Sequence, residues 1–111
     1  QVASFGYTEK QAQEAGYNVR TGKFPFMANG KALGYGESAG YIKIVIDENN
    51  NQLLGASLVG ADVSELLPEL TLAQANGLPV EAIAQNIHAH PTLSEVLMEA
   101  AEAAVGHAIH L

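Results

Sequence analysis

The chain has 111 residues, enough for one domain with its own core, and it contains no cysteine. The lack of cysteine excludes a disulfide framework, a thiolate nucleophile and a zinc–cysteine site within this sequence, and it favours a reducing, cytoplasmic location. No apolar run approaches the ~20 residues that a membrane helix needs, so no transmembrane span is expected.

The formal net charge of −7 is unevenly distributed along the chain. All five Lys and Arg lie within residues 1–43, whereas residues 44–111 carry nine of the twelve acidic residues. An acidic surface repels phosphate backbones and attracts basic partners, so nucleic-acid binding is not expected. A surface that only improves solubility is the commoner explanation of such a charge.

The first part of the chain is predicted to contain two strands and one short helix. Residues 2–5 are strand-like, and a capping-box pattern then predicts a helix over residues 8–15, which a glycine terminates. Residues 18–26 form a second predicted strand, ended by Pro25. The glycine-rich residues 30–40 are predicted to be a connection that could hold a helical turn.

Residues 41–59 are predicted to form an antiparallel hairpin. Residues 41–47 alternate between apolar and mostly polar side chains, which places three isoleucines on one face of a strand. The polar residues 48–51 turn the chain, and residues 52–59 return as a second strand. Gly55 and Gly60 in this strand allow a close approach of another backbone, or a bulge. The isoleucines are Ile42, Ile44 and Ile46.

Three helices are predicted in the remainder of the chain. The first begins at Asp62 and ends before Gly77, the second runs over residues 79–85, and the third runs from residue 92 to about residue 105. The last helix presents a stripe of partly small apolar residues, which could pack on the domain's own sheet or against another subunit. We therefore predict an α+β domain, with an antiparallel sheet flanked by helices. The stripe consists of Leu93, Val96, Leu97, Ala100 and Ala104.

The segment 88–95, with the sequence HAHPTLSE, contains a candidate proton-transfer pair. Pro91 biases His90 towards an extended backbone, just outside the helix that Thr92 is expected to begin. Glu95 lies in the first turn, where its carboxylate can contact the imidazole or cap the helix in a capping box with Thr92. Histidine has an ordinary pKa of about 6.5, and a carboxylate beside it sets its tautomer and raises its basicity, as a general base requires.

The four histidines do not predict a metal site. His88 and His90 are one residue apart in an extended segment and point to opposite sides, whereas zinc needs three or four convergent ligands. His107 and His110 are expected to belong to the C-terminal tail. The glycine-rich connection lacks the third glycine of a dinucleotide fingerprint, because Ala39 stands there, so no cofactor is expected on this chain alone.

Several segments together resemble a known family. They are HAHPTLSE, the opening VASFGYTEKQAQEAGY, the hairpin YIKIVIDENNNQLLGASLVG, and the segments KFPFMANGKALGYGE and DVSELLPELTLAQ. Together they closely resemble the C-terminal interface domain of dihydrolipoamide dehydrogenases, within the FAD/NAD-linked pyridine nucleotide-disulfide oxidoreductases. The resemblance implies that residues 1–111 are the dimerisation domain of a longer homodimeric enzyme, whose FAD and NAD domains are absent from this chain.

The resemblance also implies roles for three residues. His90 would accept a proton from the dihydrolipoyl dithiol at the partner subunit's redox disulfide, Glu95 would orient and stabilise the imidazole, and the backbone of Pro91 would lie near the partner's flavin. The isolated chain is then expected to be inactive. The dihydrolipoyl group would come from 2-oxo acid dehydrogenase complexes, whose small basic subunit-binding domain would be a further partner.

Two other functions remain open from the sequence. The glutathione reductase branch shares the fold and a similar His-Pro-Thr segment, but it usually carries a second acid just after the position of Glu95, where this chain has Val96. The other function is that of a stand-alone interaction module that performs no redox chemistry.

Overall fold

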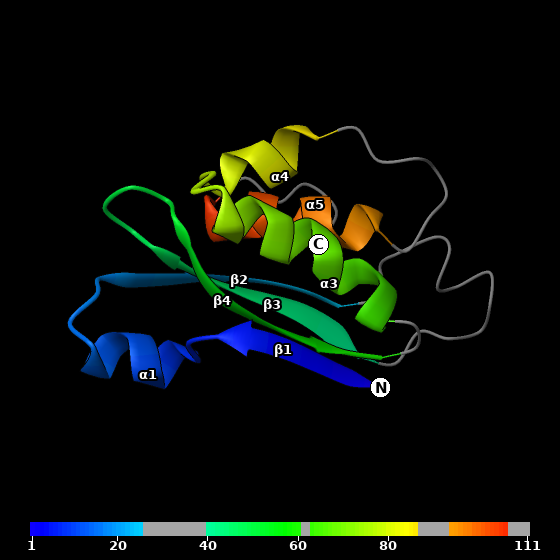
Figure 1. Cartoon of the computed structure of the whole chain (residues 1–111), viewed down its shortest axis with the longest axis horizontal. Coiled ribbons are helices and arrows are strands. Elements are labelled where there is room, and N and C mark those ends of the chain that lie inside the picture. The colour runs from blue at the N-terminus through cyan, green and yellow to red at the C-terminus, as the bar shows by residue number, and fades with distance from the viewer. Residues whose placement is uncertain (26–39, 61–62, 87–93, 107–111) are drawn as a thin grey trace.

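The computed structural model describes residues 1–25, 40–60, 63–86 and 94–106, and the account of the fold refers to these residues. They form one four-stranded sheet, with a layer of helices on one of its faces (Figure 1). The elements in chain order are β1 (Val2–Gly6), α1 (Glu9–Glu14), β2 (Val19–Pro25), β3 (Tyr41–Asp47), β4 (Leu53–Val59), α3 (Val63–Ala75), α4 (Glu81–Gln85) and α5 (Glu95–Ala104).

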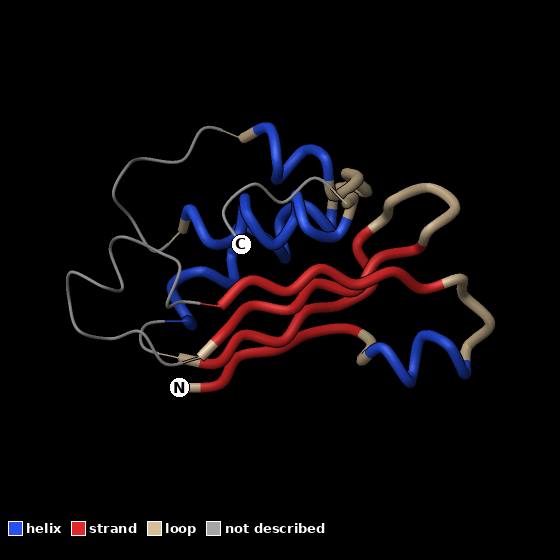
Figure 2. Tube along the Cα trace, turned by 180° about the vertical axis from the view of Figure 1, so that it is seen from behind, coloured by secondary structure: helices blue, strands red, loops and turns tan. Residues whose placement is uncertain are grey.

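The sheet has the strand order β1-β4-β3-β2, and every neighbouring pair is antiparallel. Helices α3, α4 and α5 lie together on one face of the sheet, whereas α1 lies at one end of it (Figure 2). The predicted α+β class, with an antiparallel sheet flanked by helices, is therefore confirmed. No helix in the described part of the chain is long and apolar enough to cross a lipid bilayer.

The predicted hairpin is confirmed, and the alternating apolar side chains of β3 contribute to the core. Ile42, Ile44 and Ile46 are fully buried on the face that the helices cover. Residues directly opposite each other on antiparallel strands pack side by side, and Ile42 lies between Phe24 of β2 and Leu58 of β4, both buried as well. The apolar face of the sheet is thus continuous across three strands.

The other face of the sheet is partly covered where the chain enters α1. The backbone of Tyr7 crosses β4 at Gly55, where a Cβ atom would overlap the Tyr7 carbonyl oxygen, and the Tyr7 N–H donates to the Leu54 carbonyl at 3.0 Å. Val45, opposite Gly55, is buried although it lies on this face. The close approach that the sequence predicted at Gly55 is confirmed, and a register shift in the ladder follows Val45.

Helix α1 has the predicted capping box. The Gln11 N–H donates to the Thr8 hydroxyl at 3.1 Å, and the Thr8 N–H donates to the Gln11 side chain at 3.0 Å. Two of the backbone N–H groups that the start of the helix leaves without an intrahelical partner are thus satisfied by a side chain three positions away. The helix therefore begins where the local sequence predicts.

Two later helices begin after their predicted first residues. Pro79 forms an isolated antiparallel bridge with Gln52, and the regular part of α4 follows it, beginning at Glu81. Helix α5 begins at Glu95, with Ser94 as its N-cap residue. Thr92, the predicted start of α5, lies outside the described residues, as do Asp62, the N-cap predicted for α3, and the connection at 26–39.

The small residues of α5 pack on the domain's own sheet. A Cβ atom on Gly22 of β2 would overlap the backbone of Ala100 and Ala104, so helix and strand are in direct backbone contact. Ala100, Ala101 and Ala104 are fully buried. Of the two alternatives that the sequence left open for this stripe, the structure shows the packing on the sheet.

Candidate functional site

Glu95, the acid of the predicted pair, is the first residue of α5 and is half-buried. The backbone of Ser94 before it is already helical, with φ −64° and ψ −18°, and the Ser94 side chain makes no capping hydrogen bond. The Ser94 carbonyl accepts a hydrogen bond from the Leu97 N–H at 3.0 Å. A carboxylate in this first turn is stabilised by the positive end of the helix dipole.

The position of Glu95 depends on how α5 is held against the sheet. Val96 and Leu97 directly after it are fully buried, and further along the helix Ala100 and Ala104 rest on Gly22. A side chain at the start of such an element is held more precisely than one on a loop. The structure thus places the predicted acid on a rigid support.

Sequence reasoning missed that another carboxylate of the same helix is buried. Glu99 is only 5% exposed, and it is the one charged side chain in the buried class within the described part of the chain. Residues four apart lie on the same side of a helix, so Glu95 and Glu99 are neighbours along α5. The spacing of Glu95 and Glu99 within this alanine-rich helix was the available signal. A buried glutamate is rare and is normally compensated by a partner.

The other members of the predicted site lie outside the described residues. They are His90, the predicted base, and Pro91, and the same holds for His88, His107 and His110. The pairing of His90 with Glu95 therefore stays a prediction. Among the residues that the structure describes, no group of three or more His, Asp or Glu could hold a metal ion.

In the described part of the structure, the acidic side chains of three helices lie apart from the basic side chains. The layer of α3, α4 and α5, called here the acidic helical layer, carries six glutamates and no Lys or Arg among its helical residues. The described cations lie instead on α1 and on strands β2 and β3, where Arg20 pairs with Glu48 and Lys43 pairs with Glu9, each at 2.9 Å. The glutamates are Glu65, Glu69, Glu81, Glu95, Glu99 and Glu102.

The acidic helical layer also contains an apolar groove between α3 and α4. Leu72 is 65% exposed and Leu78 is 42% exposed, and both line the groove together with buried Ile83. At its rim the Asn86 side chain donates to the Glu69 carboxylate at 3.2 Å. Large apolar side chains at such a groove mark a surface that can bind another protein.

The fold, an antiparallel sheet with its helices on one face, defines the class of dimerisation domains found in flavoprotein disulfide reductases. Residues 1–101 match the family described as pyridine nucleotide-disulphide oxidoreductase, dimerisation domain, and the chain belongs to that family.

Two curated relatives show the extent of the similarity. The dihydrolipoyl dehydrogenase of Mycobacterium bovis is 54% identical over 109 residues, which are 98% of this chain and 24% of that protein. A dihydrolipoyl dehydrogenase of Bacillus subtilis is 47% identical over 111 residues, which are 100% of this chain and 24% of that protein. The chain thus spans about a quarter of the length of the curated relatives that it matches.

Solved structures agree on the fold. The HOCl-induced flavoprotein disulfide reductase RclA from Escherichia coli superimposes with a TM-score of 0.87 and 29% identity, over 91% of this chain and 23% of that one. LpdA from Mycobacterium tuberculosis superimposes with a TM-score of 0.84 and 26% identity, over 91% of this chain and 22% of that one.

Proposed function

We propose that residues 1–111 are the dimerisation domain of a dihydrolipoyl dehydrogenase and supply its acid–base pair. The observation that carries the proposal is the 54% identity, over nearly the whole chain, to a relative of that name. The relatives of both Mycobacterium bovis and Bacillus subtilis are dihydrolipoyl dehydrogenases, which supports the lipoamide branch over the glutathione reductase branch. A cytoplasmic location belongs to the same proposal.

In the proposed mechanism His90 is the base. Its imidazole accepts a proton from the dithiol of a dihydrolipoyl group, and the resulting thiolate attacks the redox disulfide of the opposite subunit. Glu95 orients the imidazole and stabilises it once it is charged. The half-buried position of Glu95 on an anchored helix supports this role, because an orienting group must itself be held in place. The backbone of Pro91 lies near the partner's flavin in this proposal.

FAD and NAD, the cofactors of the proposed enzyme, do not fit the residues described here. Dinucleotide sites form at the carboxyl ends of parallel strands that are followed by helices, whereas every strand pair in this sheet is antiparallel. We therefore assign both cofactors to other parts of the full-length protein. This chain contributes the residues that handle the proton.

The proposed enzyme is a homodimer, because the base acts on the disulfide of the other subunit. The apolar groove between α3 and α4 supports a contact through the helical surface, since Leu72 and Leu78 leave large apolar area exposed in the single chain. Covering this area in a second copy would remove it from water. The groove is our candidate for part of the dimer contact.

The negative charge of the helical layer leads us to propose a second partner. The acidic helical layer would attract the small basic subunit-binding domain of a 2-oxo acid dehydrogenase complex, which brings the dihydrolipoyl group to the enzyme. The glutamates on three neighbouring helices, with no Lys or Arg among the helical residues, support this proposal.

The direct test is His90→Gln in the full-length flavoprotein, assayed as reduction of NAD by dihydrolipoamide across a range of pH. A positioned base typically contributes about 10² to 10⁴ in rate, and a loss of this size is expected. Oxidation of NADH with an artificial acceptor that takes electrons from the flavin serves as the control and should be retained. Turnover within a few-fold of wild type would show that His90 is not the base.

Two alternatives are separated by simple observations. Reduction of oxidised glutathione in place of lipoamide would assign the protein to the glutathione reductase branch. A natural coding sequence without an upstream CxxxxC disulfide and dinucleotide loops would instead indicate a stand-alone interaction module.

A further inference from the structure

The turn between β3 and β4 contacts the short helix α4 through Asn51. Asn51 has a φ of 58°, in the left-handed region that asparagine enters more readily than other residues with a side chain. Its side-chain amide donates a hydrogen bond to the carboxylate of Glu81 in the first turn of α4. Its carbonyl oxygen accepts a hydrogen bond from the Val80 N–H at 2.8 Å. One turn residue therefore holds the start of α4 through both its backbone and its side chain.

Helix α4 depends on such contacts for its position. It has five residues, and Val80 at its N-cap makes no side-chain capping hydrogen bond. A helix this short is not stable on its own. Besides Asn51, the described contacts that hold it include the Gln52–Pro79 bridge before its start and the hydrogen bond from Asn86 to Glu69 after its end. The place of α4 is set by residues distant in the sequence.

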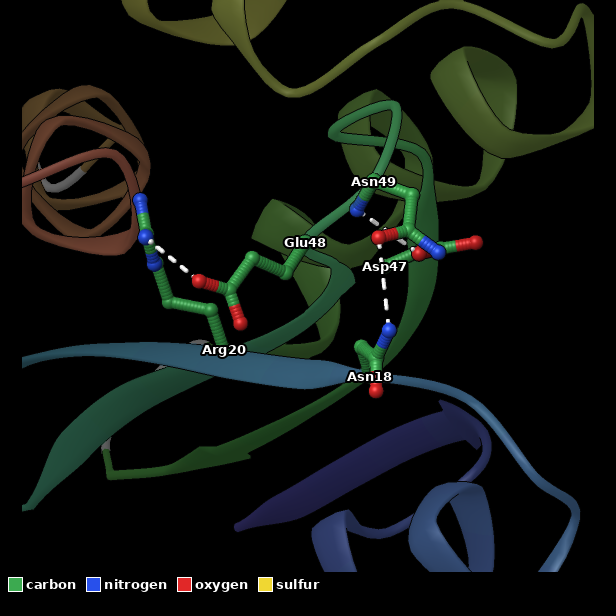
Figure 3. A network of polar contacts seen from close by, with 5 residues as sticks. All are labelled: Asn18, Arg20, Asp47, Glu48 and Asn49. Atoms are coloured by element: carbon green, nitrogen blue, oxygen red, sulfur yellow. Dashed lines mark hydrogen bonds and ion pairs between the residues drawn. The ribbon is translucent and has the colours of Figure 1, made fainter.

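The turn that carries Asn51 is itself braced, as Figure 3 shows. The Asp47 carboxylate accepts a hydrogen bond from the Asn49 N–H at 2.9 Å, and the Asn18 side chain donates to the Asn49 side chain at 3.4 Å. Arg20 of β2 pairs with Glu48 at 2.9 Å. Because these contacts tie the turn to β2, Asn51 projects from a well-supported part of the sheet.

Helix α4 in turn supports the helix of the candidate site. It packs against α5, and its buried residues Val80 and Ile83 belong to the same core cluster as Leu97 of α5. Glu95 is the first residue of α5. A displacement of α4 would therefore disturb the support of Glu95, the acid of the proposed pair.

We propose that Asn51 and Glu81 are positioning residues for Glu95, the acid of the proposed proton-transfer pair, acting through α4 and the helix α5 that packs on it. The inference rests on the function proposed above and adds two residues to it, neither of which touches the substrate. Its core is the contact between an amide donor in a sheet turn and a carboxylate at the start of α4.

The test is Asn51→Asp in the full-length flavoprotein. This change keeps the side-chain shape and the tolerance for positive φ, but it sets one carboxylate against another where a hydrogen bond existed. Because small misplacements of reacting groups cost much rate, we expect kcat for dihydrolipoamide to fall on the order of tenfold while KM changes less than about twofold. NADH oxidation with an artificial acceptor should not change, because it does not use the proposed pair.

A second substitution distinguishes positioning from general damage. When Glu81→Gln is added to Asn51→Asp, the contact again has one donor and one acceptor. The amide at position 81 now donates, and the carboxylate at position 51 accepts. The double variant should recover kcat to within about threefold of wild type, as expected for two residues that interact directly. Recovery would support the proposal, and a double variant no better than Asn51→Asp would overturn it.

Two further variants complete the design. Glu14→Gln changes an exposed residue at the end of α1 that takes no part in the described contacts of the turn or of α4, so kcat should stay within about twofold of wild type. Asn51→Gly keeps the positive φ and removes the side chain, and it is the alternative if Asn51→Asp does not fold. It should lower kcat severalfold with flavin content unchanged, and wild-type kcat in this variant would contradict the proposal.

The two proposals fail in different ways. If the wild-type protein does not oxidise dihydrolipoamide, or if His90→Gln retains its turnover, the proposed function is wrong. If His90→Gln is inactive while the Asn51 variants keep wild-type turnover, only the positioning role is wrong.

Discussion

Gly22 of β2 lies directly beneath Ala104 of α5, and a Cβ atom at Gly22 would overlap the Ala104 backbone nitrogen. The helix that begins with Glu95 thus rests on the sheet through a backbone-to-backbone contact. No side chain at Gly22 can be accommodated unless the helix or the strand moves. The height of α5 above the sheet is set at this contact.

Gly22→Ala should therefore destabilise the chain by about 2 to 3 kcal/mol, because overpacking against a backbone cannot be relieved by rotating a side chain. The measurement is urea unfolding followed by circular dichroism. Gly77→Ala is the matched control: Gly77 has a φ of 64° and open space around its Cβ position, so a strain of about 1 kcal/mol is expected. Equal losses in the two variants would contradict the steric explanation.

Glu95→Gln separates the orienting role of Glu95 from a capping role. If the carboxylate stabilises a charged imidazole, the substitution should lower kcat for dihydrolipoamide about tenfold, which is less than the loss expected for His90→Gln. Steady-state kinetics and thermal unfolding would be measured on the same full-length variant. A lower unfolding midpoint with unchanged kcat would favour capping and count against the orienting role.

Leu72→Glu tests the α3–α4 groove as part of the dimer contact. A charge at a buried apolar contact is costly, so the variant should shift the sedimentation behaviour of the full-length protein from dimer towards monomer. Val2→Glu is the control, because Val2 is 75% exposed on the edge strand β1 and does not line the groove, and the dimer should persist. A Leu72→Glu protein that sediments as a wild-type dimer would exclude this part of the groove from the contact.

The docking proposal predicts a strong dependence on salt. Raising the ionic strength from about 0.05 M to about 0.5 M shortens the screening length severalfold, and binding of a basic subunit-binding domain should weaken tenfold or more. Glu65→Lys on the exposed side of α3 should weaken the binding at low salt, whereas Glu14→Lys on α1 should have little effect. Titration calorimetry measures both effects, and affinity independent of salt would rule out the electrostatic form of the proposal.

Local patterns predicted most of the regular structure. The isoleucines of β3 recur at every second position, and the Thr8–Gln11 capping box lies within four residues, so both features depend only on near neighbours in the chain. The antiparallel hairpin and the apolar stripe of α5 were predicted for the same reason. The resemblance of long segments to one family then indicated the class of the protein, and the match of residues 1–101 confirmed it.

The sequence by itself therefore determined the α+β class and the family, and it predicted the candidate pair of His90 and Glu95. Tertiary structure alone decided that the small residues of α5 face Gly22, that Glu99 is buried, and that Asn51 holds α4 through Glu81. The first and last of these features are contacts between residues that are far apart in the sequence. The burial of Glu99 depends on which face of the helix the core covers. A periodic pattern shows that a helix has an apolar face, but only the packed fold shows which strand, turn or carboxylate that face meets.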